Sequence, residues 1–209
     1  KLGGKIATRL GNGLAPLEPG ETDTVIIAGM GGDLICKILK AKPEFLIEGK
    51  EFILQPQSEW FKVRRLLKEY HYQIEKEWFL KEDGKYYVII KAEPAWTQPQ
   101  RLKHQQPSIH EYIKEISETP ANQAVSEKDM ESIYEQYGKY LIETKNPVLK
   151  EYLKKEITKK ESIAAELKQS IKEMESEELS GKERGNIAKR QRRYQEIQKE
   201  IRDMRKAIG

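Results

Sequence analysis

The stretch of sequence that most constrains the fold is a short β-branched run that ends in three glycines within four residues. Thr24–Ala28 has the composition of a buried strand, and Gly29, Gly31 and Gly32 follow it, directly before a helical pattern that begins at Asp33. Glycines after a parallel strand permit positive φ angles and close backbone approach, and the first N–H groups of the next helix face the strand's carboxyl end. The run therefore predicts a ligand-binding strand-to-helix turn in an α/β domain.

A second strand end of the same kind follows further along the chain. Glu51–Leu54 is a short apolar run, Gln55, Pro56 and Gln57 come directly after it, and a helical pattern begins near Ser58. Proline fixes the backbone at such a strand end, and the amide of Gln55 can both donate and accept hydrogen bonds. Because parallel strands of one sheet end at the same edge, we expect both turns to border one crevice.

The pattern then changes from helical to strand periodicity. Gln73–Leu80 and Tyr86–Ala92 are strand-like runs on either side of Asp83 and Gly84, and Asp-Gly between two such runs is a strong hairpin signal. We therefore expect an α/β sheet that ends in an antiparallel hairpin, which a wholly parallel sheet would not contain. The elements expected before the hairpin also include a strand over residues 5–10 and helices over Asp33–Leu46 and Ser58–Tyr70.

The C-terminal part of the chain has the periodicity of paired helices. It follows a proline-containing stretch at residues 96–125 that has the composition of a linker. Two apolar stripes with alternating three- and four-residue spacing run through Leu153–Met174 and Ile187–Ile208, and a polar connection at residues 175–186 separates them. These stripes predict an antiparallel coiled-coil hairpin.

Charge is spread unevenly along the chain. Of the 209 residues, 34% are charged and 37% are hydrophobic, which is too polar for a single compact core and typical of extended helices. The formal net charge is +4, yet residues 185–206 contain eight Lys or Arg side chains against three acidic ones. We expect Arg190, Arg192 and Arg193 in this segment to contact RNA phosphates. The structural alternative is a solvated helix face.

Residue types exclude several classes of site. Cys36 is the single cysteine, so there is no intramolecular disulfide or cysteine zinc site, and its apolar neighbours predict a buried core thiol. His71, His104 and His110 have no carboxylate or thiol at ligand spacing, so no metal is expected. No Gly-x-Ser-x-Gly motif of a hydrolase occurs. No apolar stretch approaches the roughly 20 residues that span a bilayer, so we expect a cytoplasmic protein with no membrane contact.

Four short motifs in a fixed order carry a family resemblance. They are Gly-Asn-Gly-Leu at 11–14, Ala-Gly-Met-Gly-Gly at 28–32, Leu-Gln-Pro at 54–56 and Glu-Asp-Gly-Lys-Tyr at 82–86. Together they make the chain resemble the bacterial tRNA (adenine-22-N1)-methyltransferase family. The resemblance implies an α/β fold, the C-terminal part of a Rossmann-like class I methyltransferase domain, followed by an all-α antiparallel coiled-coil domain. It also implies S-adenosylmethionine (SAM) as cofactor and tRNA as partner. The domains expected are 1–95, the linker 96–125, and 126–209.

The resemblance assigns site residues as well. The residues expected to bind SAM are Asn12, Gly13, Leu14, Ala28, Gly29, Met30 and Gly31. The residues expected to bind the substrate are Gly32, Gln55, Pro56, Gln57 and Tyr86, together with the three arginines above. Gln57 stands where the family usually has Asn. For each set a structural alternative stays open: an ordinary Asn-Gly turn, a tight strand-to-helix turn, a rigid proline turn, or a tyrosine that only covers the sheet.

One departure from the family is informative. Family members open with a strand and an acidic, glycine-containing loop that holds the methionine part of SAM and supplies the acidic residue at the target adenine. This sequence starts at Lys1 and contains no such loop. We therefore expect the chain to be a C-terminal portion of a methyltransferase, with its catalytic residue upstream of residue 1. We also expect little or no SAM binding by the chain alone.

Two functional hypotheses of different class follow. In the first, the parent protein methylates N1 of an adenine in tRNA, and the coiled coil grips the tRNA. In the second, the polypeptide is a non-catalytic RNA-binding or coiled-coil interaction module. A nicotinamide-dependent enzyme is a third alternative, but the Gly-Met-Gly-Gly run lacks the second half of a Gly-x-Gly-x-x-Gly motif. The oligomeric state stays open, with a monomer favoured.

Overall fold

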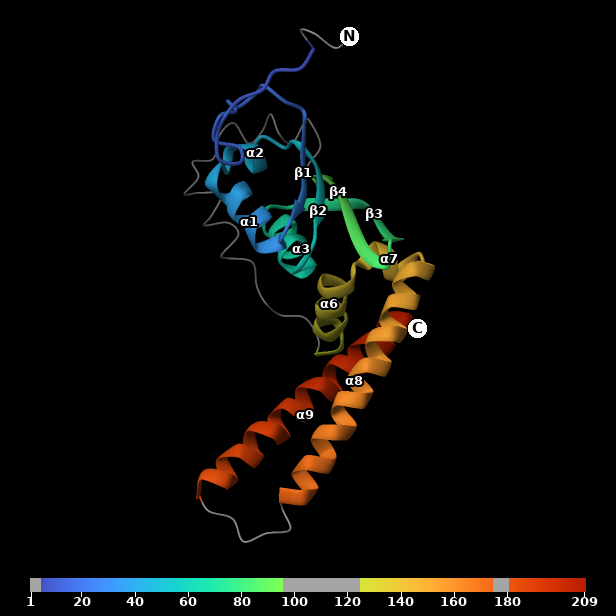
Figure 1. Cartoon of the computed structure of the whole chain (residues 1–209). Coiled ribbons are helices and arrows are strands. Elements are labelled where there is room, and N and C mark those ends of the chain that lie inside the picture. The colour runs from blue at the N-terminus through green and yellow to red at the C-terminus, as the bar shows by residue number, and fades with distance from the viewer. Residues whose placement is uncertain (1–4, 96–124, 175–180) are drawn as a thin grey trace. The chain divides into compact units, whose positions relative to one another are not determined.

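The computed structural model describes residues 5–95, 125–174 and 181–209 of the chain (Figure 1). The chain divides into two compact units, Lys1–Tyr140 and Leu141–Gly209. The first unit contains a mixed β-sheet with helices, and the second contains a pair of long helices. The first unit thus has the α/β architecture expected from the sequence.

The sheet of the first unit is built from β1 (Thr24–Met30), β2 (Glu51–Pro56), β3 (Tyr72–Glu82) and β4 (Lys85–Pro94). Their order is β1-β2-β4-β3; β1 and β2 are parallel, whereas β4 is antiparallel to both of its neighbours. Asp83 and Gly84 form the two-residue turn of the hairpin with φ angles of 48° and 75°, as a type I′ turn requires. The predicted antiparallel hairpin is confirmed.

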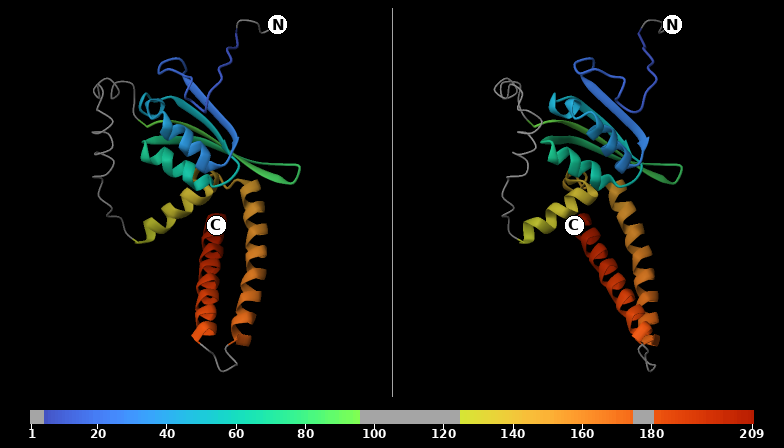
Figure 2. Two further views of the ribbon diagram at one scale, coloured as in Figure 1. Left: turned by 60° about the vertical axis from the view of Figure 1, so that its left-hand side comes forward. Right: turned by 90° about the vertical axis from the view of Figure 1, so that its left-hand side faces the viewer.

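Three helices accompany the strands, namely α1 (Gly32–Ala41), α2 (Glu44–Ile47) and α3 (Trp60–Glu69). Helices α1 and α3 pack against each other and against the same face of the sheet (Figure 2). Because strand side chains alternate between faces, every second strand residue enters this core. The core residues from the strands include Val25, Ile27, Phe52, Leu54, Val88 and Ile90, and those from the helices include Ile35, Leu39, Val63 and Leu67.

The single helix expected over Asp33–Leu46 is wrong, because the structure breaks it in two. Helix α1 ends at Ala41, and α2 begins after Pro43. Proline has no N–H to continue the helical ladder and disfavours helical geometry in the residue before it. Lys42, at this break, turns its Nζ to the carbonyl oxygen of Leu17 at 3.1 Å.

The opposite face of the sheet carries no helix among the described residues. It exposes apolar side chains of which Ile26 and Leu80 are 67% and 45% exposed. At the end of this face where β2 begins, Lys91 contacts Glu51, Glu75 and Glu93 at 2.6–3.0 Å. The hydrogen bond to Glu75 is the largest cause that raises the pKa of Lys91. The face is therefore charged at one end, where one ammonium group meets three carboxylates, and apolar at the other.

The strand expected over residues 5–10 is wrong. These residues are exposed and have no regular structure. A strand needs a neighbour for its backbone hydrogen bonds, and no described strand pairs with this segment. An ion pair of 2.5 Å between Arg9 and Glu21 fixes the segment instead, and the hydrogen bond from Arg9 lowers the pKa of Glu21 to about 2.

Helix α6 (Val125–Tyr137) belongs to the first unit and packs on α3. Its C-terminal carbonyls, those of Glu135 and Gln136, both accept hydrogen bonds from Arg64 Nη1 at 3.0 Å. The same guanidinium contacts Glu77 at 2.7 Å, and both side chains are almost completely buried. Gly138, with φ of 91°, passes close over this pair; a Cβ there would lie 2.4 Å from the Glu77 carboxylate. A buried charge pair thus fixes the end of α6.

The second unit consists mainly of α8 (Pro147–Met174) and α9 (Gly181–Ile208), while the short α7 (Lys139–Glu143) spans the boundary between the units. Asn146 caps α8, because its Oδ1 accepts the N–H groups of Val148 and Leu149 at 3.0 Å. Helices α8 and α9 pack through the predicted stripes, around the buried Ala164, Ile197 and Ile201, with Ile157, Leu167 and Tyr194 against them.

The connection between these helices is shorter than residues 175–186, because α9 is already helical at Gly181 and includes Gly185. Glycine weakens a helix interior without forbidding it, so a glycine alone does not mark the boundary. The expected linker lies, except for Val125, outside the described residues. No helix in the described part of the chain combines the length and apolarity needed to cross a membrane.

Candidate functional site

The ends of β1 and β2 meet at one edge of the sheet, as their parallel pairing requires. The ladder is irregular between Ala28 and Met30, so that Gly29 forms a bulge. With φ of 78°, Gly29 turns its N–H to the side chain of Gln55, whose Oε1 accepts at 2.8 Å. One residue further, the N–H of Gln57 donates to the carbonyl oxygen of Met30 at 2.8 Å. The two predicted turns are therefore joined by hydrogen bonds into one rim.

The three glycines of this rim serve different purposes. Gly29 supplies a positive φ, and a Cβ there would meet no atom within 4 Å. Gly32 supplies close approach, since a Cβ would lie 2.5 Å from the carbonyl oxygen of Glu59. Gly31 has an ordinary φ of −63°, and a Cβ would lie 3.2 Å from the Ser58 hydroxyl. Only Gly29 and Gly32 are thus required by the turn itself.

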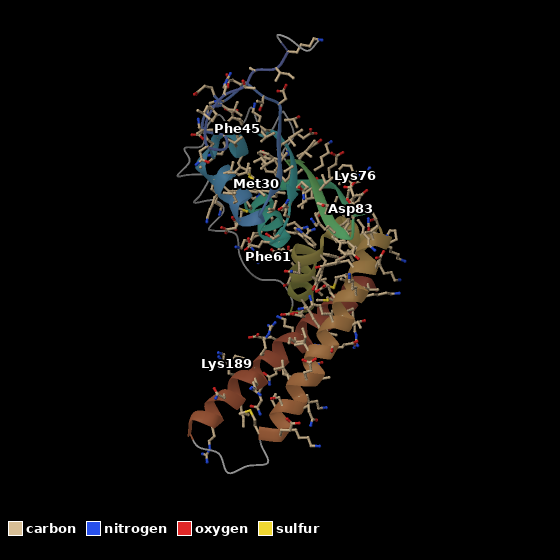
Figure 3. All side chains as sticks on the ribbon, viewed as in Figure 1. Met30, Phe45, Phe61, Lys76, Asp83 and Lys189 are labelled. Atoms are coloured by element: carbon tan, nitrogen blue, oxygen red, sulfur yellow. The ribbon has the colours of Figure 1, made fainter. Side chains whose placement is uncertain are left out.

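A hollow of about 400 Å³ runs beside β1. We call it the β1 hollow. It brings the predicted residues Gly13 and Leu14 to the same place as Ala28 and Met30, although the two motifs are far apart in sequence. Figure 3 labels Met30, where β1 meets α1. The rest of the lining comes from Leu17, Thr22, residues 24–27 and Ile38.

The Gly-Asn-Gly-Leu turn is positioned by α1. Gly13 has φ of 58°, and a Cβ there would lie 2.9 Å from a methyl carbon of Ile38, so the turn packs directly on the helix. Leu14 is buried, whereas Asn12 is exposed, and its backbone carbonyl oxygen accepts a hydrogen bond from the N–H of Ala15 at 3.1 Å. Among the predicted residues of this motif, Gly13 and Leu14 line the hollow, and Asn12 lies at the outer side of the turn.

A second hollow, of about 480 Å³, lies at the same edge of the sheet, on the face opposite to α1 and α3, which we call the open face. We call it the β4 hollow. It is lined by Gln55 from β2, Leu80, Lys81 and Glu82 from β3, and Tyr87 and Ile89 from β4. Gln55 therefore connects the rim with this hollow. Of its neighbours in the predicted motif, Pro56 is buried and Gln57 is exposed.

Tyr86, the tyrosine expected at the substrate, does not line the β4 hollow. Its ring lies 5.8 Å from that of Phe79, and Lys81 Nζ lies 5.7 Å above it, so it packs within the hairpin. Tyr87 occupies the hollow instead, because neighbouring residues of a strand point to opposite faces. Sequence reasoning missed Tyr87, although alternation from the core residues Val88 and Ile90 assigns it to the open face.

The charged groups next to the glycine turn are paired. Asp33 contacts Lys37 at 2.8 Å and Lys62 at 3.0 Å, and the hydrogen bond from Lys37 lowers the pKa of Asp33. Cys36 is half-buried and not the core thiol that was expected, because it sits at the margin of the apolar stripe of α1; burial raises its pKa. Within the described ranges, no group of three or more His, Cys, Asp or Glu side chains could hold a metal ion.

The predicted arginines on α9 differ in their surroundings. Arg190 donates to the Ser170 hydroxyl, and Arg193 contacts Glu196 at 3.1 Å and Glu200 at 3.6 Å. Arg192 is exposed and makes no ion pair within the described residues. It begins a row along the outer side of α9 whose other members are Gln195, Lys199, Arg202 and Lys206, at helical spacing and without an acidic residue.

Comparison with known proteins gives consistent results. A family model described as tRNA (adenine(22)-N(1))-methyltransferase matches residues 1–120. The tRNA (adenine(22)-N(1))-methyltransferase of Bacillus subtilis is 40% identical over 92 residues, which are 44% of this chain and 39% of that protein. The match to a second curated relative covers 37% of that protein. The chain thus spans about two fifths of the length of the curated relatives it matches.

Solved structures share the fold. The B. subtilis M1A22 tRNA methyltransferase TrmK superposes with a TM-score of 0.62 at 23% identity, covering 96% of this chain and 69% of that one. TrmK of M. capricolum, solved with S-adenosyl-homocysteine, gives a TM-score of 0.57 at 20% identity, covering 96% and 67%. Since the family model matches more than half of the chain, and matches the part that contains both strand ends, the chain belongs to the tRNA (adenine(22)-N(1))-methyltransferase family.

Proposed function

We propose that the protein acts in the SAM-dependent methylation of N1 of adenine 22 in tRNA. Family membership over residues 1–120 supports this reaction. The single structural observation that carries it is the rim in which Gly29 donates to Gln55, because it joins the two strand ends where α/β proteins bind ligands. We also propose that the protein is cytoplasmic and monomeric.

The β1 hollow suits one part of SAM. Leu14 and Ile38 offer apolar contact to an adenine ring, and the buried hydroxyl of Thr22, which has no hydrogen-bond partner in the described part of the chain, offers a polar contact. No carboxylate is among the residues that line this hollow. The ribose hydroxyls and the methionine ammonium, which carboxylates commonly bind, thus find no such partner there. When bound, SAM would supply the methyl group as an electrophile.

This partial fit gives a testable expectation. The 209-residue chain should bind SAM and adenosine with nearly equal, low affinity, because its own residues engage only the adenine end. Titration calorimetry with both ligands measures this. An affinity for SAM more than about tenfold above that for adenosine, equivalent to about 1.4 kcal/mol, would mean that the methionine part is held as well.

The proposed reaction depends on positioning. Adenine N1 lies on the edge used for base pairing, so the base must be unpaired and held with N1 in line with the methyl group. The hydrogen bonds between Gly29 and Gln55 and between Gln57 and Met30 make the rim rigid without any ionised side chain. Such a rim can orient a neutral base and leave its N1 lone pair available.

We further propose that α8 and α9 form a coiled-coil hairpin that binds the tRNA backbone. The acid-free row on the outer side of α9 supports this, since Arg192, Lys199 and Arg202 make no ion pair within the described residues. Lys189, also on α9, is exposed (Figure 3). Cations that no carboxylate neutralises are the ones able to displace counterions from phosphates.

The reaction is tested in the organism that encodes the protein. A methyl group on N1 blocks the pairing edge of adenine, so it stops reverse transcription at that nucleotide. Deleting the gene should remove the stop at position 22 of the tRNAs that carry it, and the restored gene should return it. Persistence of the stop in the deletion strain contradicts the proposed reaction.

A second candidate, a non-catalytic RNA-binding module, is favoured by the basic row on α9 alone. It predicts that the purified chain binds tRNA while the deletion strain keeps the stop at position 22. The two candidates therefore give opposite results in the same reverse-transcription assay.

A further inference from the structure

The β4 hollow has the chemistry of a nucleobase site. Its apolar walls are Leu80 and Ile89, its aromatic surface is Tyr87, and Gln55 contributes an amide. Its volume of about 480 Å³ lies within the range of roughly 300–1,000 Å³ seen for small-molecule pockets. The hollow also lies at the carboxyl edge of β1 and β2, because β3, which β4 separates from β2, runs in the same direction as β2.

Tyr87 is suited to contact a planar ring. It is half-buried on the open face, where Leu80 is its cross-strand neighbour in the antiparallel register. Tyr86, next to it, is committed to Phe79 and Lys81 on the hairpin. Aromatic side chains that remain available beside an apolar hollow are the usual stacking partners of unpaired bases.

Gln55 adds a directional group. The N–H of Gly29 fixes which end of its amide is the acceptor, because Oε1 receives that hydrogen bond. Its Nε2 is buried and has no acceptor within the described residues. A buried donor without an acceptor is costly, and a bound ligand that accepts its hydrogen bond would remove that cost.

We propose that the β4 hollow binds the target adenine of tRNA, with the ring against Tyr87 and with Gln55 Nε2 donating to a ring nitrogen. This inference rests on the proposed function. The accepting atom is N3 or N7, because N1 must keep its lone pair for the reaction. The site therefore selects an unpaired purine by its shape and by one ring nitrogen away from the reacting edge.

The test uses the 209-residue chain and a tRNA transcript with fluorescent 2-aminopurine at position 22. Extrusion of this base from its neighbours changes its fluorescence, and the titration gives an apparent dissociation constant. Tyr87→Ala should weaken binding at least about fivefold, because the base loses its aromatic stacking partner, whereas Tyr87→Phe should keep it. Gln55→Glu, which keeps the acceptor for Gly29 and removes the donor, should weaken it as well.

Gln73→Glu is the matched control for charge, because Gln73 is exposed on β3 and lies outside the hollow. It should bind like the unaltered chain, and circular dichroism melts verify that all variants fold. The proposed base site is overturned if the unaltered chain causes no fluorescence change. It is also overturned if Tyr87→Ala and Gln55→Glu bind like the unaltered chain. The reverse-transcription assay decides the proposed reaction separately, since it does not depend on these variants.

Discussion

The sheet unit and the helix pair reach their order in different ways. In the sheet unit, individual groups have specific partners: Gly29 with Gln55, Gly32 against the Glu59 backbone, Arg64 with Glu77. In the helix pair, a repeated apolar stripe around Ile197 defines the packing, and most other positions face solvent. The difference teaches where a sequence change is felt: by position in the sheet unit, and by pattern in the helix pair.

Removing one member of the buried charge pair should have the largest effect. Glu77→Ala leaves the Arg64 guanidinium buried without its carboxylate, which costs about 3–5 kcal/mol of unfolding free energy. Urea unfolding followed by circular dichroism measures it. Glu82→Ala, at an exposed position of the same strand, is the control and should change stability by less than about 0.5 kcal/mol. Equal effects would show that the pair does not anchor the unit.

A glycine-to-alanine substitution should change stability in opposite directions in the two units. Gly32→Ala places a Cβ 2.5 Å from a backbone oxygen and should destabilise by about 1–3 kcal/mol. Gly185→Ala lies in the helix α9, where a Cβ meets no atom within 4 Å, and should stabilise by about 0.4–1 kcal/mol. Thermal melts of both variants give the comparison. A gain from Gly32→Ala would mean that the turn relaxes at no cost.

Charge removal on α9 should separate available from paired cations. Replacing Arg192 and Lys199 by Gln should lower the slope of log affinity for tRNA against log salt by about 2, because each of these cations neutralises about one phosphate. Replacing Arg193 and Arg205 by Gln removes the same charge, but these side chains pair with Glu196 and Glu161 at 3.1 and 2.6 Å. The slope for this second double variant should change little. Equal slopes for the two double variants would show that binding depends on net charge alone.

The smallest expected effect is the local loss of the Arg9–Glu21 ion pair at low pH. The pKa of Glu21 is lowered to about 2 by Arg9, below its ordinary value of 4.5, so the carboxylate stabilises the folded segment above pH 4.5. This contribution is lost as the pH falls from about 4.5 to about 2. The Glu18 N–H donates to Glu21 at 2.7 Å, so its amide NMR shift should titrate near pH 2. A midpoint near 4.5 would show that the ion pair does not form.

The sequence predicted the elements that carry their own local signals. Asp83-Gly84 specified the hairpin, and the period of the apolar residues specified α8 and α9. The strand over residues 5–10 failed because strand formation depends on a partner, which a local pattern does not reveal. The helix over Asp33–Leu46 failed at Pro43, whose restriction on its neighbours outweighed the apolar pattern.

The candidate site divides along the same line. The meeting of the Gly29 and Gln55 turns was predictable from parallel strand topology. The structure packs Tyr86 against Phe79 and places Tyr87 at the β4 hollow. The sequence could not distinguish the two, because the choice depends on the exact phase of β4 against the core. The distinction between Arg192 and Arg193 required the positions of Glu196 and Glu200 around the helix.

The bulge at Gly29 determines which insertions and deletions this loop can tolerate during evolution. A strand assigns its side chains to two sides by odd and even count, and one extra residue reverses the count for everything after it. Met30 therefore aligns with Pro56, whereas a regular ladder continued from Ala28 and Gln55 would align it with Gln57. Deleting Gly29 would remove the extra residue and restore regular alternation. The side chains between Gly29 and α1 would then point to the opposite face of the sheet. Insertions and deletions here should thus be tolerated only in pairs.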